Sequence, residues 1–555
     1  MKKIKPRFIA GPPGTGKTHI YIVKELYQEL LLKYEPSRII ILSHTNVAAD
    51  QIRDAVLALT VMKERGFTKK SMKYKICTIH RFCKNFLRVA QKDKFEYEDH
   101  KNLIGQNKLF GRDPSTNVDK HALYKFRSDA KGRGMLLDEY WRVCDQKSYK
   151  PYSIELIKEL LPIYKQYKKD NNKCDYSDMI EDFNHQDVKE PDIDVVIIDE
   201  CQDSNVPQTQ AIEKMATNVK EGHYYLVGDA DQTLFEYAGS NANYFHKLAA
   251  NPYHELTEGL RCSEAINTKC KKIIMPIWNE WKSHRVWTPA KYTKKHGMGH
   301  IGEVIKGHGY YLSNFEGSSH LDILLNKIRN TDQTFLFTYR VGAGVGDTRC
   351  TKFFDYHGLE YAHVKNSAHI PKKELRAHHL WPDFIKGIPM SLTQIEHFWE
   401  YMGSKVIVHG KGDPKVFDGW TKQDYTIDHL ITKGLLKPGC KQYTDFDLVR
   451  VPSKTTKEIL IYIKKVLSKG FDFDKKTQIK YGNIHEVKGL TFDNVIVDHT
   501  LTRPEDWFTQ LRLAYTAYSR GVFDYWTLAK SPEKWKTTLA KKDDQYELDE
   551  KQTIR

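Results

Sequence analysis

Short apolar runs alternate with segments of helical periodicity along the first part of the chain. Residues 38–42 and 76–80 have the length and composition of buried strands, and residues 47–59 have the spacing of an amphipathic helix. This alternation is typical of a parallel α/β sheet, because parallel neighbours need a crossover connection. The same pattern predicts later strands at 193–198, 224–227, 334–338, 361–364, 406–408 and 495–497.

Two long stretches interrupt the pattern. Residues 95–174 are rich in Lys, Asp, Tyr and Asn, with helical spacing at 136–143 and 154–167. Residues 366–454 have irregular apolar spacing and several Gly and Pro residues. We therefore predict an α/β protein with parallel sheets, interrupted twice by mainly helical insertions, and a charged tail after Lys530.

The length and hydropathy of the chain indicate a multidomain protein without a membrane span. A chain of 555 residues is too long for one hydrophobic core, so several domain-sized units are expected. No apolar run approaches the roughly 18 residues of a membrane span, and the basic start runs directly into a glycine-rich segment rather than a signal peptide. We expect a cytoplasmic protein without a membrane partner.

Charge and cysteine usage narrow the class further. Lys and Arg number 87 against 71 Asp and Glu, a formal net charge of +16. Such an excess favours a polyanionic partner, most simply nucleic acid, although a basic enzyme without one is the alternative. The nine cysteines include no C-x-x-C pair, which favours reduced thiols over a zinc site.

The strongest chemical signal is the segment Gly11–Thr18, which fits the phosphate-binding pattern G-x-x-x-x-G-K-[ST]. Glycines let backbone N–H groups surround phosphate oxygens at a helix N-terminus. Lys17 is predicted to reach the β- and γ-phosphates, and Thr18 to ligate Mg²⁺. A chance glycine-rich turn is the alternative. The predicted nucleotide contacts are Gly11, Pro12, Pro13, Gly14, Thr15, Gly16, Lys17 and Thr18.

A second acidic segment completes the predicted hydrolytic site. The buried strand at 195–198 leads into Asp199 and Glu200, where Asp199 would hold Mg²⁺ and Glu200 would orient and deprotonate water. An ordinary acidic turn after a strand is the alternative. The next strand leads to Gln232, which could sense the γ-phosphate, although Gly-Asp turns such as the one before it are common.

The order of these segments resembles superfamily 1 helicases of the UvrD/Rep/PcrA-like group. Eight segments carry the resemblance between Gly11 and Gly521: GPPGTGKT, SHTNVAADQI, TIHRFCKNFL, DECQD, LVGDADQTLFEYAGS, LTEGLRCSEAI, IHEVKGLTFDNV and RLAYTAYSRG. The resemblance implies two RecA-like domains with ATP between them, each with an insertion. The implied ranges are 1–90 with 175–255, 91–174 (first insertion), 256–365 with 455–530, 366–454 (a reduced second insertion) and 531–555 (tail).

The resemblance also implies roles for particular residues. Arg261 and Arg520 match two arginines that reach the γ-phosphate, a role that guanidinium groups suit because they stabilise charge on the transferring phosphoryl group. Gly489 matches a residue of the nucleotide-binding interface. The implied DNA contacts are His44, Thr45, Asn46, Thr78, His80, Phe82, Phe235, Tyr237, His485 and Lys488. For Phe235 and Tyr237, which would stack bases, core packing is the alternative that sequence alone favours.

Departures from the family pattern gather on the nucleoside side of the nucleotide. No glutamine-containing segment precedes Gly11, Leu260 replaces a tyrosine that stacks on adenine, and Thr491 replaces a glutamate that binds the sugar. We therefore predict relaxed base selectivity, so that NTPs other than ATP support turnover. On the DNA side, His44, Val47 and Ala238 replace a common phenylalanine, lysine and arginine.

These observations predict an ATP- and Mg²⁺-dependent DNA helicase or single-strand translocase. Its expected substrates are single-stranded DNA and single-strand/duplex junctions, with 3′→5′ polarity implied by the resemblance, and it is expected to act as a monomer. One alternative is an ATPase that remodels protein–DNA complexes, and another is a recombination or replication switch with little unwinding. A nucleoside-type kinase shares only the phosphate loop, and no carboxylate-rich nuclease domain follows Arg520.

Overall fold

A computed structural model of the chain describes residues 4–86, 92–111, 121–185, 193–217, 219–291, 305–306, 319–340, 345–365, 370–408, 413–421, 423–450, 457–471, 473, 475–498 and 507–529. Its internal contacts divide the chain into two units. Unit 1 comprises Met1–Gly297 and Asp506–Ser519, and unit 2 comprises Met298–Glu505 and Arg520–Arg555. Within the described part, no helix combines the length and the apolar character that a membrane crossing requires.

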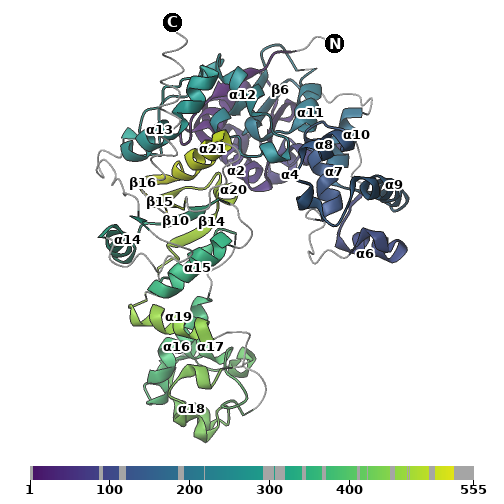
Figure 1. The fold of residues 1–555 in the computed structure, drawn as a ribbon. Helices are drawn as coiled ribbons and strands as arrows, with labels where there is room; N and C mark the ends of the chain where they lie inside the picture. Colours follow the sequence, from purple (N-terminus) through teal and green to yellow (C-terminus); the bar gives the residue numbers. More distant parts are fainter. Residues whose placement is uncertain are drawn as a thin grey trace. The chain divides into compact units, whose positions relative to one another are not determined.

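Unit 1 is built on a six-stranded sheet in which every paired strand is parallel (Figure 1). In spatial order the strands are β3 (Ile76–Thr78), β2 (Ile39–Ser43), β6 (Val195–Asp199), β7 (Tyr224–Gly228), β1 (Arg7–Ala10) and β8 (His254–Glu255). The register pairs Phe8 with Leu226 and Ile40 with Val196. The predicted α/β class with parallel sheets is confirmed.

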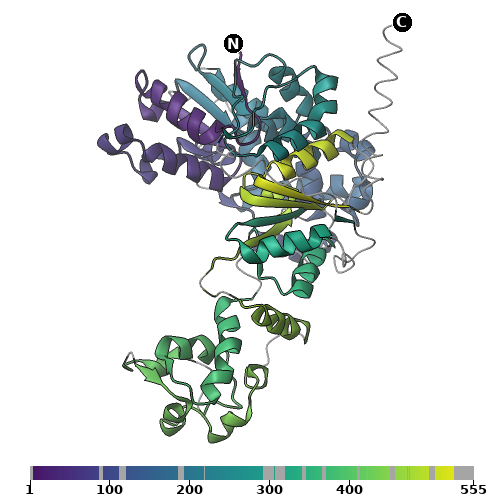
Figure 2. The same cartoon turned by 90° about the vertical axis from the view of Figure 1, so that its left-hand side faces the viewer.

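The central strands of this sheet are buried on both faces, which explains why their sequences are apolar without alternation. Ile40 and Leu42 point into one core together with α5 (Ile79–Phe86) and α11 (Val206–Ala216). Ile39 and Ile41 point into the other, with η1 (Lys17–Tyr27) and α2 (Asn46–Leu57). Helices therefore cover both faces of the sheet (Figures 1 and 2).

The remaining helices of unit 1 extend this framework. They are α1 (Gln28–Leu31), η2 (Pro36–Arg38), α3 (Thr60–Glu64), α4 (Lys69–Met72), α10 (Tyr176–His185), η7 (Cys201–Asp203), η8 (Ala230–Gln232), η9 (Glu236–Ala238), α12 (Ala242–Ala249), α13 (Glu264–Trp281) and α21 (Trp507–Tyr518). Thr45 caps α2, because its hydroxyl accepts a hydrogen bond from Ala48 N–H at 3.1 Å.

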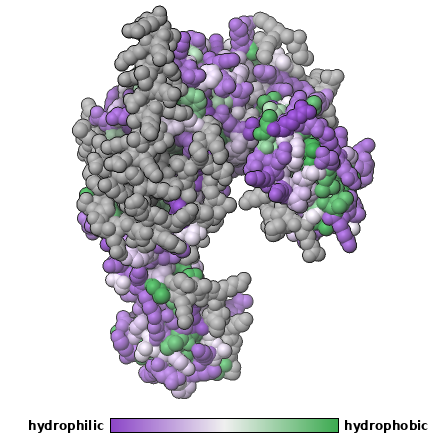
Figure 3. All heavy atoms as spheres, in the orientation of Figure 1, coloured by the Kyte–Doolittle hydropathy of each residue, from purple (hydrophilic) through white to green (hydrophobic). Residues whose placement is uncertain are grey.

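The first insertion is helical, as the sequence predicts. It contains α6 (Tyr97–Gln106), η4 (Lys108–Phe110), α7 (Ala122–Gly132), α8 (Leu137–Val143), η6 (Gln146–Tyr149) and α9 (Ile154–Asp170), with the short parallel pair β4 (Asp93–Lys94) and β5 (Lys173–Cys174). Its core is rich in tyrosine, including Tyr124, Tyr149 and Tyr164. The surface in Figure 3 is mainly hydrophilic, with apolar spheres over this insertion, where Leu136 and Val143 are exposed.

Unit 2 contains a second parallel sheet, in the order β11 (Tyr361–His363), β14 (Ile479–Asn483), β10 (Phe335–Tyr339), β15 (Phe492–Asp498), β16 (Gly521–Ala529) and β9 (Ile305–Lys306). Helices α14 (Ser319–Asn330), α15 (Val345–His357) and α19 (Lys457–Ser468) supply its core with Leu324, Phe354 and Ile463. The short helix α20 (Ile484–Val487) follows β14.

The second insertion has its own aromatic core. Its elements are α16 (Lys372–Ile385), β12 (Met390–Ser391), α17 (Leu392–Trp399), η12 (Pro414–Phe417), β13 (Asp424–Tyr425), α18 (Ile427–Thr432), η13 (Pro438–Gln442) and η14 (Phe446–Leu448). The strand predicted at 406–408 is wrong, because Val406 and Ile407 donate turn hydrogen bonds to Gly403 C=O. Both side chains are buried, and a short apolar run has the same appearance in a buried turn as in a strand.

The observed units differ from the predicted ranges at two places. Residues 256–297 and α21 lie with unit 1, so Arg261 shares a unit with the phosphate loop while Arg520 belongs to unit 2. The reason is packing of α13 and α21 against the loop after β7: Trp278 Nε1 donates to Asp231 at 2.7 Å, and Tyr515 OH donates to Asp229 at 3.3 Å. The predicted tail at 531–555 lies outside the described residues.

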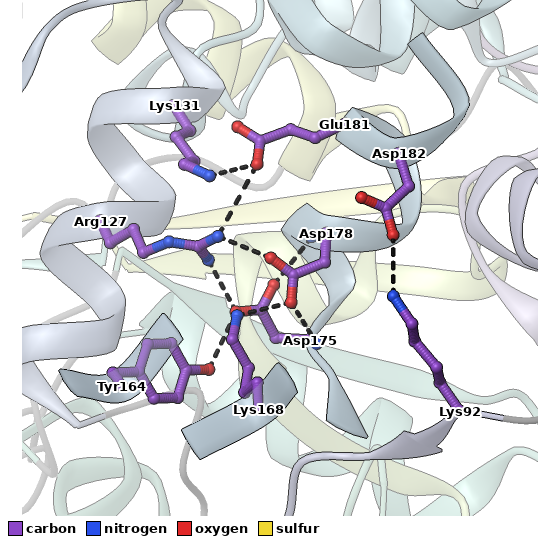
Figure 4. A network of polar contacts seen from close by, with 9 residues as sticks. All are labelled: Lys92, Arg127, Lys131, Tyr164, Lys168, Asp175, Asp178, Glu181 and Asp182. Atoms are coloured by element: carbon purple, nitrogen blue, oxygen red, sulfur yellow. Dashed lines mark hydrogen bonds and ion pairs between the residues drawn. The ribbon is translucent and has the colours of Figure 1, made fainter. Parts of the chain in front are cut away.

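A buried ion network joins the first insertion to α10 (Figure 4). Arg127 contacts Asp175 at 2.6 Å and Asp178 at 2.7 Å, and Lys168 contacts the same two carboxylates. Burial alone would raise the pKa of Asp175, but Arg127 and Lys168 outweigh it and hold this pKa well below 3.8. Three elements, α7, α9 and α10, are thereby fixed by one charge cluster.

Replacing Arg127 by Leu should lower the free energy of unfolding of unit 1 by about 3–5 kcal/mol, because it leaves buried carboxylates without their cation. The measurement is urea unfolding at pH 7. Since the folded pKa of Asp175 lies below its unfolded value, this stabilisation is present above about pH 4 and is lost at lower pH. Lys101→Met, which removes an exposed ion pair with Glu98, is the control and should change little. Equal effects of the two variants would contradict the prediction.

Candidate nucleotide and nucleic-acid sites

The phosphate loop connects β1 to η1 at the carboxyl edge of the unit 1 sheet, where ligands bind in parallel sheets. Gly14 and Gly16 adopt φ of 72° and 81°, a left-handed conformation that favours glycine. Lys17 is buried, and its Nζ donates to Gly11 C=O at 2.8 Å. The first N–H groups of η1 have no partner within the helix, as at any helix start, so the loop can receive an anion.

Asp199 lies opposite the loop at the end of β6. Thr18 Oγ1 donates to Asp199 Oδ2 at 3.0 Å, while Asp199 Oδ1 is buried and has no hydrogen-bond partner among the described residues. Burial, and then the neighbouring Glu200, raises the pKa of Asp199 to about 7. A hydroxyl and an unsatisfied buried carboxylate side by side are oxygen ligands of the kind that Mg²⁺ prefers.

Glu200 occupies an unusual backbone conformation. Its φ of 52° is left-handed, which costs a residue with a side chain free energy and is often found at functional positions. Gln202 Nε2 donates to the Glu200 carboxylate at 2.5 Å, and Gln202 Oε1 accepts from Asp229 N–H at 3.2 Å. A Cβ on Gly228 would lie 2.2 Å from Gln202 Oε1, so the residue at 228 must be small. The loops after β6 and β7 are therefore locked together.

Gln232 is held by a buried acidic cluster that sequence reasoning missed. Its Nε2 donates to Asp229 Oδ2 at 2.8 Å, and Arg285 Nη1 donates to Asp229 Oδ1 at 2.9 Å. Burial, and then Asp231, raises the pKa of Asp229, and Arg285 opposes this shift. The Gly-Asp turn was visible in the sequence, but no sequence signal marks Arg285.

Of the two arginines implied by the resemblance, Arg261 lies beside the phosphate loop. A Cβ on Gly14 would lie 2.5 Å from Arg261 Cβ, and Leu260 N–H donates to Gly14 C=O at 2.8 Å. Arg261 Nη1 donates to Ser519 C=O at 3.3 Å. Arg520 and Gly489 both lie in unit 2, where Arg520 C=O accepts from Phe492 N–H and Gly489 has φ of 87°.

The candidate nucleic-acid contacts after β2 are mostly accessible. Thr45 and Asn46 are exposed at the start of α2, although the Thr45 hydroxyl already serves as the helix cap. His44 Nε2 lies 3.2 Å from Ser204 Oγ. These residues form a polar edge next to the loop after β6.

The candidates after β3 differ among themselves. Phe82 is 6% exposed and packs edge-on against Phe183 in the core, and Thr78 is buried with its hydroxyl accepting from Arg81 N–H. His80 is half-buried and lies edge-on to Tyr176, with ring centroids 5.3 Å apart. Burial lowers the pKa of His80 to about 4, so it is neutral at physiological pH.

Phe235 and Tyr237 stand on the loop that continues from Gln232. Tyr237 is 54% exposed and Phe235 is half-buried, with ring centroids 6.0 Å apart. The core-packing alternative that sequence favoured therefore does not describe Tyr237. We refer to Phe235–Tyr237 as the aromatic loop.

The remaining candidates, His485 and Lys488, follow β14 in unit 2. Asn483 caps α20 in a reciprocal arrangement with Glu486, at 3.1 Å in each direction. Both candidate side chains are half-buried. The cap fixes the direction in which this short helix leaves the sheet.

Together, the phosphate loop, the paired Thr18 and Asp199, and the parallel sheets are typical of the α/β class of P-loop nucleotide-binding proteins. Comparison with known proteins narrows this class, because residues 2–252 match the family described as the UvrD/REP helicase N-terminal domain. The match supports the resemblance to UvrD/Rep-like superfamily 1 helicases, and over residues 2–252 the chain is similar to that family's N-terminal domain.

Individual relatives agree with this assignment. The chain is 27% identical over 319 residues to a probable DNA helicase II homolog of Mycoplasma capricolum, covering 52% of this chain and 41% of the relative. It is 26% identical over 256 residues to the ATP-dependent DNA helicase Rep of Buchnera aphidicola from Schizaphis graminum, covering 42% of this chain and 36% of the relative. The chain thus spans less than half the length of these two relatives.

The contrast between Phe82 and Tyr237 predicts opposite effects of truncation on stability. Phe82→Ala should lower the free energy of unfolding by about 3 kcal/mol or more, because it opens a cavity in the core. Tyr237→Ala should lower it by less than about 1 kcal/mol, because its ring is largely exposed. Urea unfolding of the two variants measures both values. A large loss with Tyr237→Ala would show that the ring packs as a core residue.

Proposed function

We propose that the chain is an ATP-dependent DNA helicase or single-stranded DNA translocase. The observation that carries the proposal is the continuous arrangement from Thr18 and Asp199 through Gln232 to the exposed Tyr237, all in unit 1. It connects a phosphate-binding site to an aromatic side chain that can stack on any base. The names of the relatives, DNA helicase II homolog and ATP-dependent DNA helicase Rep, support the same conclusion.

The geometry suggests how hydrolysis would proceed. The loop N–H groups and Lys17 would bind the β- and γ-phosphates. Thr18 and Asp199 would hold Mg²⁺, which when bound neutralises phosphate charge. Glu200, oriented by Gln202, would accept the proton of the attacking water, and Arg261 and Arg520 would stabilise charge on the transferred phosphoryl group. Asp199 must be ionised for this role, and because burial raises its pKa, binding of Mg²⁺ should weaken as the pH falls.

DNA would be held by stacking and by backbone contacts. Tyr237 and Phe235 offer ring faces, while Thr45, Asn46 and His80 lie after neighbouring strands of the same sheet. His485 and Lys488 would supply contacts from unit 2. Changes in nucleotide state would alter this grip and move the strand. The 3′→5′ polarity, the preference for single-strand/duplex junctions and a monomeric state belong to this proposal by resemblance. A remodelling ATPase with little unwinding is the second candidate.

Lys17→Ala should lower DNA-stimulated ATP hydrolysis by at least about 100-fold, because it removes a charge that stabilises the transferring phosphoryl group. Hydrolysis is measured with and without single-stranded DNA, beside unwinding of 3′- and 5′-tailed duplexes. Lys24→Ala, an exposed lysine on the same helix, is the matched control and should retain activity. No stimulation of the wild type by DNA would overturn the motor proposal. Protein displacement without unwinding would favour the remodelling candidate.

The nucleoside side of the site predicts relaxed base selectivity. Leu260, 39% exposed, and Ile20 lie against Gly16 and offer apolar contact without a polar group to read the base. GTP and CTP should therefore retain more than one hundredth of the kcat/KM for ATP, a difference of less than about 2.7 kcal/mol.

Steady-state hydrolysis of the four NTPs measures this selectivity. Leu260→Tyr should lower the KM for ATP by about fivefold through ring stacking, which is worth about 1 kcal/mol at its lower end. Leu32→Tyr, at a position 84% exposed and away from the loop, is the control. If the kcat/KM of the wild type for ATP exceeds that for GTP and CTP by more than about 100-fold, the prediction is wrong.

A further inference from the structure

The aromatic loop carries an ion pair that the hydrolysis scheme does not use. Glu236 lies between Phe235 and Tyr237, and its Oε2 accepts from Arg512 Nη1 at 2.6 Å and from Thr509 Oγ1 at 3.1 Å. Arg512 and Thr509 are both on α21, far away in sequence but within unit 1. The Arg512 side chain is 3% exposed and that of Glu236 is 34% exposed, so losing the carboxylate would leave a buried guanidinium without its counter-charge. The pair therefore ties the loop to one helix.

Arg512 is also connected, through His246, to Asp231 in the loop after β7. Its Nη2 lies 3.4 Å from His246 Nε2, and His246 stacks on Trp281 with centroids 5.5 Å apart and planes 9° apart. Burial, and then Arg512 and Arg285, lowers the pKa of His246 to about 3, so the ring is neutral and its Nε2 accepts from Arg512. Its Nδ1 then faces Asp231 Oδ1 at 3.9 Å.

Helix α21 also contacts the loop after β7, which carries Gln232, directly. Tyr515, three residues after Arg512 and so on the same face of α21, donates to Asp229 Oδ2 at 3.3 Å. That carboxylate oxygen also accepts from Gln232. Two residues on one face of α21 therefore contact the two loops that the proposed motor must coordinate, the Gln232 loop and the aromatic loop.

Helix α21 is also where the chain changes unit. It ends at Tyr518, Ser519 is the last residue of this segment of unit 1, and the next residue, Arg520, belongs to unit 2. Ser519 C=O accepts from Arg261 Nη1 at 3.3 Å. A shift of α21 would therefore move groups that contact Arg261 beside the phosphate loop and Glu236 in the aromatic loop.

We propose that Glu236 and Arg512 are positioning residues that couple nucleotide binding to the grip of the aromatic loop through α21. The inference rests on the proposed DNA-dependent function. It assigns the coupling to particular contacts on α21. Arg512 binds Glu236 of the aromatic loop, and Tyr515, one turn later, shares the Asp229 carboxylate with Gln232. Neither residue is among the proposed nucleotide or DNA contacts, so loss of the pair should reduce communication between the two sites more than binding at either one.

The test measures the coupling itself. The affinity for a fluorescent oligo-dT strand is measured with and without a non-hydrolysable ATP analogue, and the ratio of the two values is the coupling factor. By linkage, the same factor must describe how the strand changes the affinity for the analogue. In the wild type we expect a factor of about 5 or more, within the usual range for coupled sites.

Glu236→Gln keeps the shape of the side chain but removes its charge, and should bring the coupling factor to within about twofold of 1. Affinity for the strand without nucleotide should change by less than about threefold. Arg512→Lys, which keeps the charge but cannot reach Glu236 and His246 together, should give the same result. Glu98→Gln, in an exposed pair with Lys101 in the same unit, is the control and should leave the factor unchanged.

Thr509→Val provides a milder variant if either substitution prevents folding, since it removes only the second hydrogen bond to the Glu236 carboxylate. It should lower the coupling factor partially. If the wild type is coupled and these folded variants keep its coupling factor, the inference is overturned while the motor proposal stands. If the wild type shows neither DNA-stimulated hydrolysis nor coupling, the proposed function fails, and the inference fails with it.

Discussion

The parallel pairing of β1 with β7 is the constraint on which the rest of the unit 1 site depends. Phe8 pairs with Leu226, and Gly11 N–H, directly after β1, donates to the C=O of Gly228, the last residue of β7, at 3.2 Å. This places the start of the phosphate loop directly against the start of the Asp229 loop. Since β6 pairs with the other side of β7, Asp199 arrives at the same edge. Backbone hydrogen bonds thus bring the phosphate loop together with the Asp199 and Asp229 segments, which follow it by about 190 and 220 residues in the sequence.

Buried carboxylates at this edge have two different environments, and the difference explains their proposed roles. Asp229 is surrounded by donors from Arg285, Gln232 and Tyr515, so its side chain is held in place and orients other groups. Asp199 receives one hydrogen bond from Thr18 and keeps a buried oxygen without a partner among the described residues. A buried carboxylate that is only half satisfied is costly unless a cation completes it. This difference favours Asp199 over Asp229 as the position of the proposed metal ion.

Sequence reasoning succeeded where a local signal corresponds to a local structure. The phosphate loop, the apolar strands β2, β6 and β7, and the helices of the first insertion all follow from short-range patterns, and the structure contains them. It failed where the partner is distant: nothing near Arg512 or Arg285 reveals that each meets a carboxylate from a loop hundreds or tens of residues away. The sequence also did not reveal which aromatic side chains are buried. Phe82 and Tyr237 both belong to motifs that match the family, yet Phe82 lies in the core and Tyr237 is exposed.

The positions of the charged residues bear on the expected nucleic-acid partner. Three buried arginines are matched by carboxylates: Arg127 by Asp175 and Asp178, Arg285 by Asp229, and Arg512 by Glu236. These clusters add little to the formal net charge of +16, so the excess of lysine and arginine must come largely from outside them. Exposed positive charge attracts a polyanion at long range without reading its sequence. Stacking of a base on Tyr237 likewise does not depend on which base it is. Charge and stacking together are therefore suited to a strand that must be gripped at every position, because neither favours one sequence over another.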